Sequence, residues 1–306
     1  MKDFFKKLAK YIDWQLKSAT QKKEIYSNMI KELETVPETA ALLQMAKDKN
    51  VPIVMDPGLG FGNTSGFWQK KKKRIHISPF SGWPARTLAH ELRHMWQETR
   101  IADPLCYTPT SQLLMLRLME ADAETFAYVF AHRLTGYELD IKQHINQMSA
   151  ELKEAKDTQE KQSIIAAFNE KGQRISFPEI EVYKERIESS FISGQKDLYL
   201  YDQKFLHLGY LDCLIAESSK KPIERRDLTE EEIRSVLRIG VNDNAPVFFA
   251  DKTNDEIRKI LTADIKPEVW QAATLMDRFL QAGTPKEMRA ELKEKYTAAR
   301  RALKKS

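Results

Sequence analysis

The sequence predicts an α+β fold that is mostly helical, with a small antiparallel sheet packed on one helix and a helical C-terminal region. Three observations predict this fold. Apolar residues recur at helical spacing over most of the chain. Strand-like segments are confined to residues 51–78, and from residue 138 onward the chain is strongly charged with helical patterning.

The composition is that of a globular protein. Apolar residues make up 42% of the 306 residues and charged residues 30%. A chain of this length and apolar content can form a stable core without disulfide bonds. Cys106 and Cys213 lie far apart and form no C-x-x-C pattern, so the chain is expected in a reducing compartment. The net charge of +5 is mild and carries no strong nucleic-acid signal.

The sequence predicts a cytoplasmic protein. No apolar run reaches the length of a transmembrane segment. The N-terminus is charged but lacks the long apolar stretch and the cleavage site of a signal peptide. Export by a signal-independent route stays open, and so does the oligomeric state.

Residues 1–47 are expected to be helical. In the first part of this segment, lysines occupy one face of the predicted helix. Apolar residues recur at helical spacing on the opposite face, namely Phe4, Phe5, Leu8, Ile12 and Leu16. Such a helix can lie on a membrane surface. The favoured interpretation is a surface helix that packs its apolar stripe on the core.

The predicted strands follow. Residues 51–55, 67–68 and 74–78 have strand character, and the Gly-rich stretch 56–63 between the first two is a loop. That loop lacks the lysine and the spacing of a phosphate-binding loop. The basic run Lys70–Lys73 is expected to be a solvated hairpin tip, although a basic cluster can also bind nucleic acid or anionic lipid.

The remaining elements are helices. One helix is expected from Thr87 to about Arg100 and a second from about Ser111 to Leu134. Further helices are predicted over 151–171, 180–193, 197–218, 229–239, 253–263, 266–282 and 285–304, with a capping box at Thr229–Glu232. The chain is therefore divided into an N-terminal domain that contains the predicted strands, residues 1–150, and a helical region of unknown role, residues 151–306.

The motif that carries chemistry is His90-Glu91-Leu92-Arg93-His94. Two histidines four residues apart lie on one face of a helix, where both imidazoles can hold a single ion. The carboxylate of Glu91 then points toward that ion without binding it. It can take a proton from a metal-activated water and pass it to a leaving amine.

A third ligand is expected on the next helix. Glu120, Ala123, Glu124 and Ala127 share one helical face, and the small residues let this helix approach the first one closely. Glu120 is the predicted ligand. Glu124, one turn later, can accept a hydrogen bond from a ligand histidine. Asp122 lies about 200° around the helix and should point elsewhere.

The pattern resembles the gluzincin type of HExxH zinc metallopeptidase. It is also similar to the ImmA/IrrE peptidases, through Glu120-x-x-Ala123-x-x-Phe126-Ala127, and to an uncharacterised bacterial family of proposed metallopeptidases, through residues 88–97. The resemblance covers about residues 50–135 and implies a Zn²⁺ cofactor. Many relatives have a small residue at the position of Arg93, which is expected to point away from the metal or to pair with Glu98 or Glu124.

The predicted function is hydrolysis of a protein or peptide substrate by a zinc-dependent peptidase. The alternative is a catalytically inactive scaffold of the same fold, acting as a regulatory module or binding nucleic acid or a membrane. No donor for the tetrahedral oxyanion is assigned from the available candidates, which are Tyr107, His132, His144, Tyr201, His207 and Tyr210.

Overall fold

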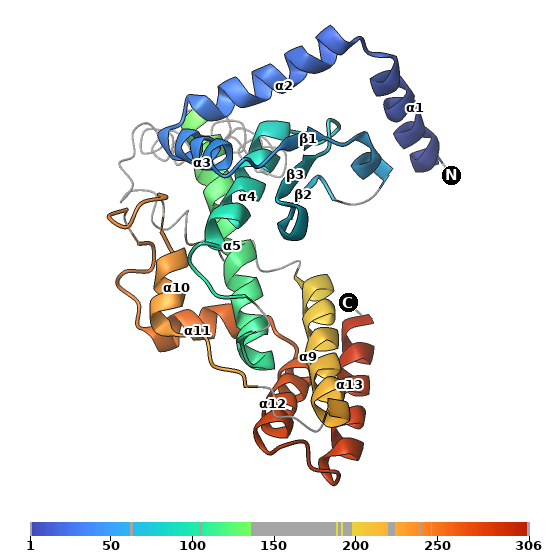
Figure 1. Cartoon of the computed structure of the whole chain (residues 1–306), viewed down its shortest axis with the longest axis vertical. Coiled ribbons are helices and arrows are strands. Elements are labelled where there is room, and N and C mark those ends of the chain that lie inside the picture. Colours follow the sequence, from blue (N-terminus) through green and yellow to red (C-terminus); the bar gives the residue numbers. More distant parts are fainter. Residues whose placement is uncertain are drawn as a thin grey trace, which may run out of the picture. The chain divides into compact units, whose positions relative to one another are not determined.

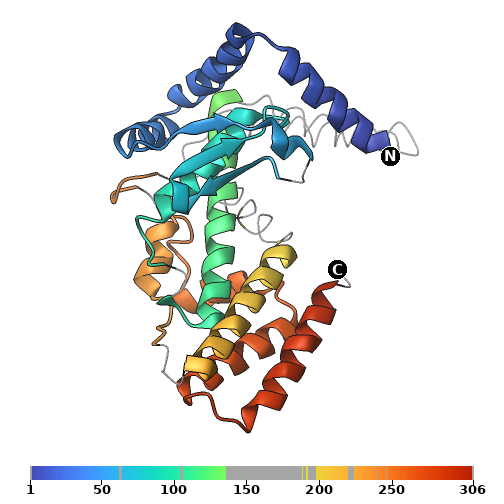
Figure 2. The same ribbon diagram turned by 45° about the vertical axis from the view of Figure 1, so that its right-hand side comes forward.

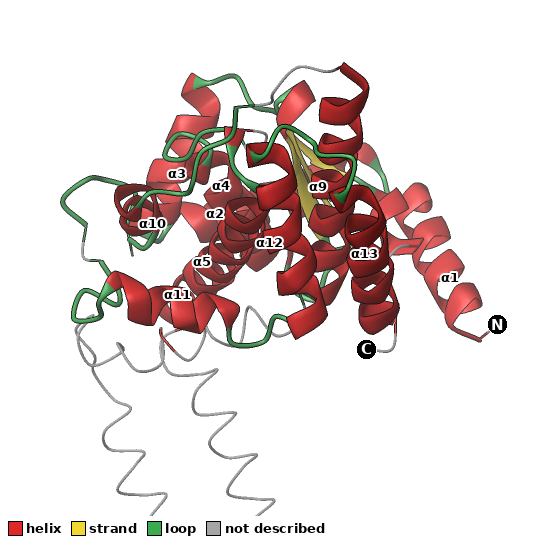
Figure 3. Ribbon diagram, turned by 90° about the horizontal axis from the view of Figure 1, so that it is seen from below, coloured by secondary structure: helices red, strands yellow, loops and turns green. Residues whose placement is uncertain are grey.

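A computed structural model describes residues 2–61, 64–103, 106–135, 198–219, 224–238, 240–245 and 247–304, together with Glu188 and Phe191. The N-terminal half contains α1 (Lys2–Leu16), α2 (Ala19–Glu34), α3 (Pro37–Asp48), β1 (Ile53–Met55), β2 (Gly66–Gln69), β3 (Arg74–Ile77), α4 (Pro84–Gln97) and α5 (Pro109–Thr135). The C-terminal half contains α9 (Tyr199–Ser219), α10 (Glu230–Val236), α11 (Asn254–Thr262), α12 (Pro267–Gln281) and α13 (Met288–Lys304). Figure 3 shows how small the share of strand is, and the predicted α+β, mostly helical fold is confirmed.

The chain forms two compact units. The first comprises residues 1–89 and 126–187, and the second comprises residues 90–125 and 188–306. Helices α4 and α5 contribute to both units. The residues of the predicted metal site, from His90 to Glu124, all belong to the second unit.

The sheet of the first unit has three strands in the order β1-β3-β2 (Figure 2). Strands β2 and β3 are antiparallel, but β1 runs parallel to β3, so the sheet is mixed and the expectation of an antiparallel sheet was wrong. The short turn at Lys70–Lys73 forces β2 and β3 to be antiparallel, whereas the longer connection after β1 lets that strand lie parallel on the other side of β3. The lysines of the turn are exposed.

The sheet packs against the beginning of α4. Gly66 of β2 lies so near Thr87 that a Cβ at residue 66 would come within 2.8 Å of the Thr87 methyl group. The absence of a side chain at Gly66 therefore permits this close approach. Ile75 and Ile77 of β3 are fully buried, which places the core of this unit at the centre of its sheet.

Helix α1 packs by a different face from the one expected. Trp14 is buried and its ring lies 6.2 Å from that of Phe80. The side chains of Phe5, Ile12 and Leu16 are 61%, 49% and 80% exposed. The expectation that this apolar stripe packs on the core was therefore wrong for these three residues, and Trp14 is buried instead.

The second unit is built around the helices α9, α12 and α13, which pack against one another (Figure 1). Their shared core includes Val269, Met276 and Phe279, each at most 1% exposed. Arg117 of α5 is tied to Asp202 of α9 by a buried ion pair of 2.6 Å. This pair joins the helix that carries Glu120 to the three-helix core.

The ends of the C-terminal helices follow local sequence signals. Thr229 accepts a hydrogen bond from the backbone N–H of Glu232 and the Glu232 side chain accepts one in return, as the capping box predicted. The same arrangement joins Thr253 and Glu256 at the start of α11. The bounds of α9 to α13 agree with the predicted ones to within three residues.

Some predictions fall outside the described residues: the helix over 151–171, most of the helix over 180–193 and the domain boundary at residue 150. The division into domains at that residue stays a prediction. Among the residues that the structure describes, no helix is both long enough and apolar enough to cross a membrane.

Candidate metal centre

The helix α4 presents two faces of opposite character. Pro84 opens the helix, where a missing N–H costs nothing. Leu88, Leu92 and Trp96 are fully buried on one side. His90 and His94 lie one turn apart on another side, with side chains 20% and 13% exposed. The apolar face therefore anchors the helix and leaves both imidazoles partly accessible.

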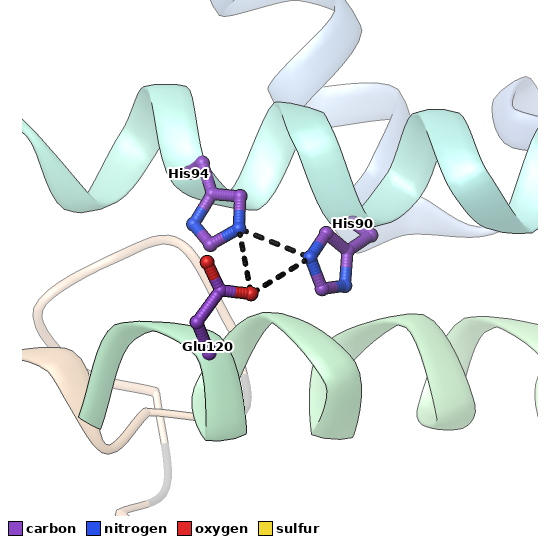
Figure 4. Close-up of side chains that lie close together, drawn as sticks. All are labelled: His90, His94 and Glu120. Atoms are coloured by element: carbon purple, nitrogen blue, oxygen red, sulfur yellow. Dashed lines mark hydrogen bonds and ion pairs between the residues drawn. The ribbon is translucent and has the colours of Figure 1, made fainter. Parts of the chain in front are cut away.

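The helix α5 comes close to α4 because small residues surround Glu120. Ala121 and Ala123 are fully buried, and neither side chain is large enough to hold the helices apart. Glu120 itself is 16% exposed and projects toward the two histidines (Figure 4). The three side chains thus converge from two adjacent helices.

The distances within this group fit one metal ion. The Nε2 atoms of His90 and His94 are 3.0 Å apart, and Oε2 of Glu120 lies 3.5 Å from each of them. Ligands of a tetrahedral zinc ion, bound at roughly 2.0–2.1 Å, are about 3.3 Å from one another. The three ligand atoms are therefore already spaced for such an ion, and the group could hold a metal.

The electrostatics of the group also favour a cation. Burial by itself lowers the pKa of His90, but the carboxylates of Glu120, Glu124 and Glu91 outweigh burial and raise it to about 10. Burial raises the pKa of Glu120, yet the two imidazoles reverse this and hold that pKa well below its usual range. The carboxylates thus attract positive charge to the point where the three ligand atoms meet.

Two more carboxylates, those of Glu91 and Glu124, interact with the histidines of this group. Glu91 is 6% exposed and acts electrostatically on both histidines. Oε2 of Glu124 lies 3.5 Å from Nδ1 of His90, on the side of the ring away from Glu120. The structure therefore places Glu124 where it can orient His90.

Several other histidines and tyrosines have structural partners elsewhere. The Tyr107 hydroxyl donates to Glu232 at 2.5 Å, and His207 lies 2.8 Å from the Tyr296 hydroxyl. Tyr210 stacks on Tyr296 with ring centroids 4.0 Å apart. The backbone or side chain of His144 and of Tyr201 lies outside the described residues. The oxyanion donor therefore stays unassigned.

Comparison with known proteins identifies the family. A family model matches residues 7–170, which is more than half of the chain. The chain belongs to the Putative metallopeptidase family (DUF6782). No curated protein and no solved structure matches it. Membership of DUF6782 implies a metal ion, and His90, His94 and Glu120 form a group that could hold it.

In this DUF6782 protein, Arg93 lies away from the metal group. It is completely buried and binds both carboxylate oxygens of Asp122 at 2.7 and 2.9 Å, a partner that the sequence analysis did not name. Asp122 binds Arg93 and Gln97 and is not one of the three residues whose ligand atoms converge. A side chain at the fourth position of the motif can be long here because an acidic partner is buried beneath it.

Gln97 is a residue of this site that sequence reasoning missed. Its Oε1 atom lies 2.8 Å from Nδ1 of His94. The sequence did contain a signal for this contact, because residues three positions apart on a helix are neighbours, as His94 and Gln97 are. It was not used because a glutamine in a helix has no distinctive chemistry until its partners are known.

Proposed function

We propose that this member of DUF6782 is a zinc-dependent peptidase of the HExxH gluzincin type. The observation that carries the proposal is the convergence of His90, His94 and Glu120, whose ligand atoms lie 3.0 to 3.5 Å apart. Two imidazole nitrogens and one carboxylate oxygen are a ligand set of catalytic zinc sites, which keep a fourth position open. The partial exposure of the three side chains leaves room for water and substrate.

When bound, zinc supplies the Lewis acidity that makes a water molecule nucleophilic at neutral pH. The residues of the chain supply the rest of the reaction. Glu91 accepts the proton of the attacking water and delivers it to the amine as the peptide C–N bond breaks. Its burial and its electrostatic effect on both histidines support this role.

Glu124 has an orienting role in this proposal. As a carboxylate beside Nδ1 of His90, it favours the tautomer that carries the proton on Nδ1. The Nε2 lone pair of His90 is then available to the metal. The substrate is a protein or peptide, and a cytoplasmic location is part of the same proposal.

The metal content of the purified protein tests the ligand set. We expect one zinc ion per chain in the wild type and none in His94→Ala or Glu120→Ala, measured by atomic emission spectroscopy on protein without a metal-binding tag. His207→Ala is the control, because His207 pairs with Tyr296 instead and should leave the zinc in place. Equal zinc in the wild type and both ligand variants would overturn the assignment.

Cleavage is then assayed with the zinc-loaded wild type. Fluorescently labelled casein and a mixture of synthetic peptides are the probes, and mass spectrometry identifies the cleaved bonds. Cleavage that a chelator abolishes and zinc restores is the expected result. A zinc-loaded protein that cleaves none of these probes would favour the inactive scaffold.

A further inference from the structure

Both polar atoms of the Gln97 side chain make hydrogen bonds. Its Nε2 donates to the backbone oxygen of Met119 at 2.8 Å and to Oδ2 of Asp122 at 2.6 Å. Its Oε1 lies 2.8 Å from Nδ1 of His94. Gln97 is fully buried, so water does not compete for these bonds.

These contacts leave the amide of Gln97 one orientation. A carbonyl oxygen and a carboxylate oxygen can only accept, so the group that faces both must be the NH₂. In the opposite orientation, an amide oxygen would face two acceptors in a buried site, at the cost of two lost hydrogen bonds. The oxygen of Gln97 must therefore face His94.

The orientation of Gln97 in turn determines the tautomer of His94. An amide oxygen accepts only, so Nδ1 of His94 must carry a proton. When a metal binds, Nε2 is therefore the nitrogen that gives up its proton and presents its lone pair, toward the point that it shares with Nε2 of His90 and Oε2 of Glu120. That is the state in which a histidine binds a metal through Nε2.

We infer that Gln97 is a positioning residue, which holds His94 as an Nε2 ligand of the metal. The inference rests on the proposed function, since it presupposes a metal between His90 and His94. The two histidines are thus oriented differently, His90 by the carboxylate of Glu124 and His94 by a neutral amide. An amide orients the ring without adding a fourth negative charge to Glu91, Glu120 and Glu124.

Asp122 and Arg93 hold Gln97 in place. Arg93 pairs with Asp122 and also donates to the backbone oxygens of Gly240 at 2.9 Å, Val236 at 3.1 Å and Arg238. Its guanidinium lies 3.7 Å from the centre of the Trp96 ring. Gln97, the side chain that orients His94, is therefore held through Asp122 by an arginine whose guanidinium is itself fixed by several contacts.

This support extends beyond the part of the chain that the family model matches. The match ends at residue 170, whereas the oxygens that accept from Arg93 belong to residues 236–240. Trp96 adds a further bond, from Nε1 to the backbone oxygen of Val241 at 3.0 Å. The C-terminal segment thus helps to keep the metal ligand His94 in position.

The test compares Gln97→Met with Gln112→Met in the full-length protein. Gln112 is also buried in this unit, and its Nε2 donates to the backbone oxygen of Tyr107 at 2.9 Å. The two substitutions are equal in size and polarity, so they control for a general loss of stability. Zinc affinity is measured by competition with a chromophoric chelator. We expect Gln97→Met to weaken it by about 10- to 100-fold and Gln112→Met to leave it unchanged.

The second measurement uses the wild type, so its result does not depend on whether a variant folds. In the zinc-loaded wild type, ¹⁵N nuclear magnetic resonance of the histidine rings should show a proton on Nδ1 of His94 and metal on Nε2. A proton on Nε2 with metal on Nδ1 would overturn the inference. So would a zinc affinity of Gln97→Met equal to that of Gln112→Met.

The outcomes separate this inference from the proposed function. Zinc binding that depends on Gln97, in a protein that cleaves no probe, would support the positioning role and contradict the peptidase activity. If Gln97→Met changed neither cleavage nor zinc binding, the peptidase activity would be supported and the positioning role of Gln97 would be contradicted. A wild type that binds no zinc would overturn both.

Discussion

Individual residues of the candidate metal group differ in how directly the structure supports the roles proposed for them. His90, His94 and Glu120 are defined by mutual distances of 3.0 to 3.5 Å. Glu91 is defined by its place in the motif and by its burial, with 6% of its surface exposed. A variant that keeps the size of Glu91 and removes its basicity is therefore the most direct test of its role.

Glu91→Gln should retain one zinc ion per chain and lose cleavage, because an amide can accept a hydrogen bond from water but cannot accept its proton. The expected loss of rate is about 100-fold or more, the usual contribution of a general base. Cleavage of labelled casein and zinc content are measured on the same preparation. Glu98→Gln, one residue beyond the end of the same helix, is the control and should cleave normally. Full activity in Glu91→Gln would contradict the mechanism.

At the scale of the elements, short helices are delimited by capping boxes. In α10, Glu232 serves the cap and also binds Arg226 at 2.6 Å. In α11, Glu256 serves the same kind of cap without a comparable arginine bond among the contacts described. The two helices therefore offer a matched comparison of a cap with and without an ion pair.

The pH dependence of stability should differ between these two caps. The hydrogen bond from Arg226, with those from Tyr107 and Thr229, overcomes the opposing effect of burial and lowers the pKa of Glu232 from 4.5 to about 2. A lowered pKa means that the ionised form stabilises the folded state above pH 4.5, and that this contribution is lost as the pH falls toward 2.

Urea unfolding of Glu232→Gln and Glu256→Gln at neutral and acidic pH checks this expectation. The wild type should be more stable than Glu232→Gln near neutral pH, and the difference should shrink as the pH falls below 4.5. Glu256→Gln should show a smaller change with pH, because its cap lacks the ion pair. A difference for Glu232→Gln that is constant with pH would show that the carboxylate is not stabilised by Arg226.

At the scale of the whole molecule, contacts distant in sequence complete the surroundings of the metal group. Arg93 and the backbone of residues 236–240 are joined by hydrogen bonds across 143 to 147 residues. Arg93 and Asp122 are 0% and 1% exposed, so neither charge is hydrated. Removing one of them leaves the other buried without its counter-ion.

Arg93→Met should therefore destabilise the protein strongly, by about 3–5 kcal/mol, the usual effect of breaking a buried ion pair. Arg100→Met is the control. Arg100 also lies over the Trp96 ring and binds Asp243 and the oxygen of Val241. Asp243 is 77% exposed, so this substitution should cost less than about 1 kcal/mol. Equal losses in urea unfolding would contradict the importance of burial at Arg93.

Much of the fold and the metal group was predictable because the signals are local. The spacing of His90 and His94 requires only a helix, and the face shared by Glu120 and Glu124 requires only a second one. Two of the C-terminal helices begin at residues whose effect on the backbone acts within one turn, Thr229 as the N-cap of α10 and Pro267 as the first residue of α12. Where a structural feature depends on a few neighbouring residues, the sequence is sufficient.

Other features depended on contacts that local patterns do not contain. The direction of β1 beside β3, and the face by which α1 packs, are decided by which surfaces meet after folding. The partners of Arg93, which are Asp122 and the backbone oxygens of Val236, Arg238 and Gly240, become visible only in the folded chain. The orientation of the Gln97 amide, on which its proposed role depends, follows only from its contacts with Met119 and Asp122.

The sequence by itself therefore determined the helices, the predicted ligands and the predicted base, because helical periodicity relates residues three or four positions apart. The tertiary structure alone decided how those ligands are oriented. A histidine tautomer and an amide orientation are set by buried hydrogen-bond partners that come from distant parts of the chain. In this protein Asp122, the ionic partner of Arg93, lies on the next helix, and the backbone oxygens that accept from Arg93 lie more than 140 residues away, beyond the reach of any local pattern.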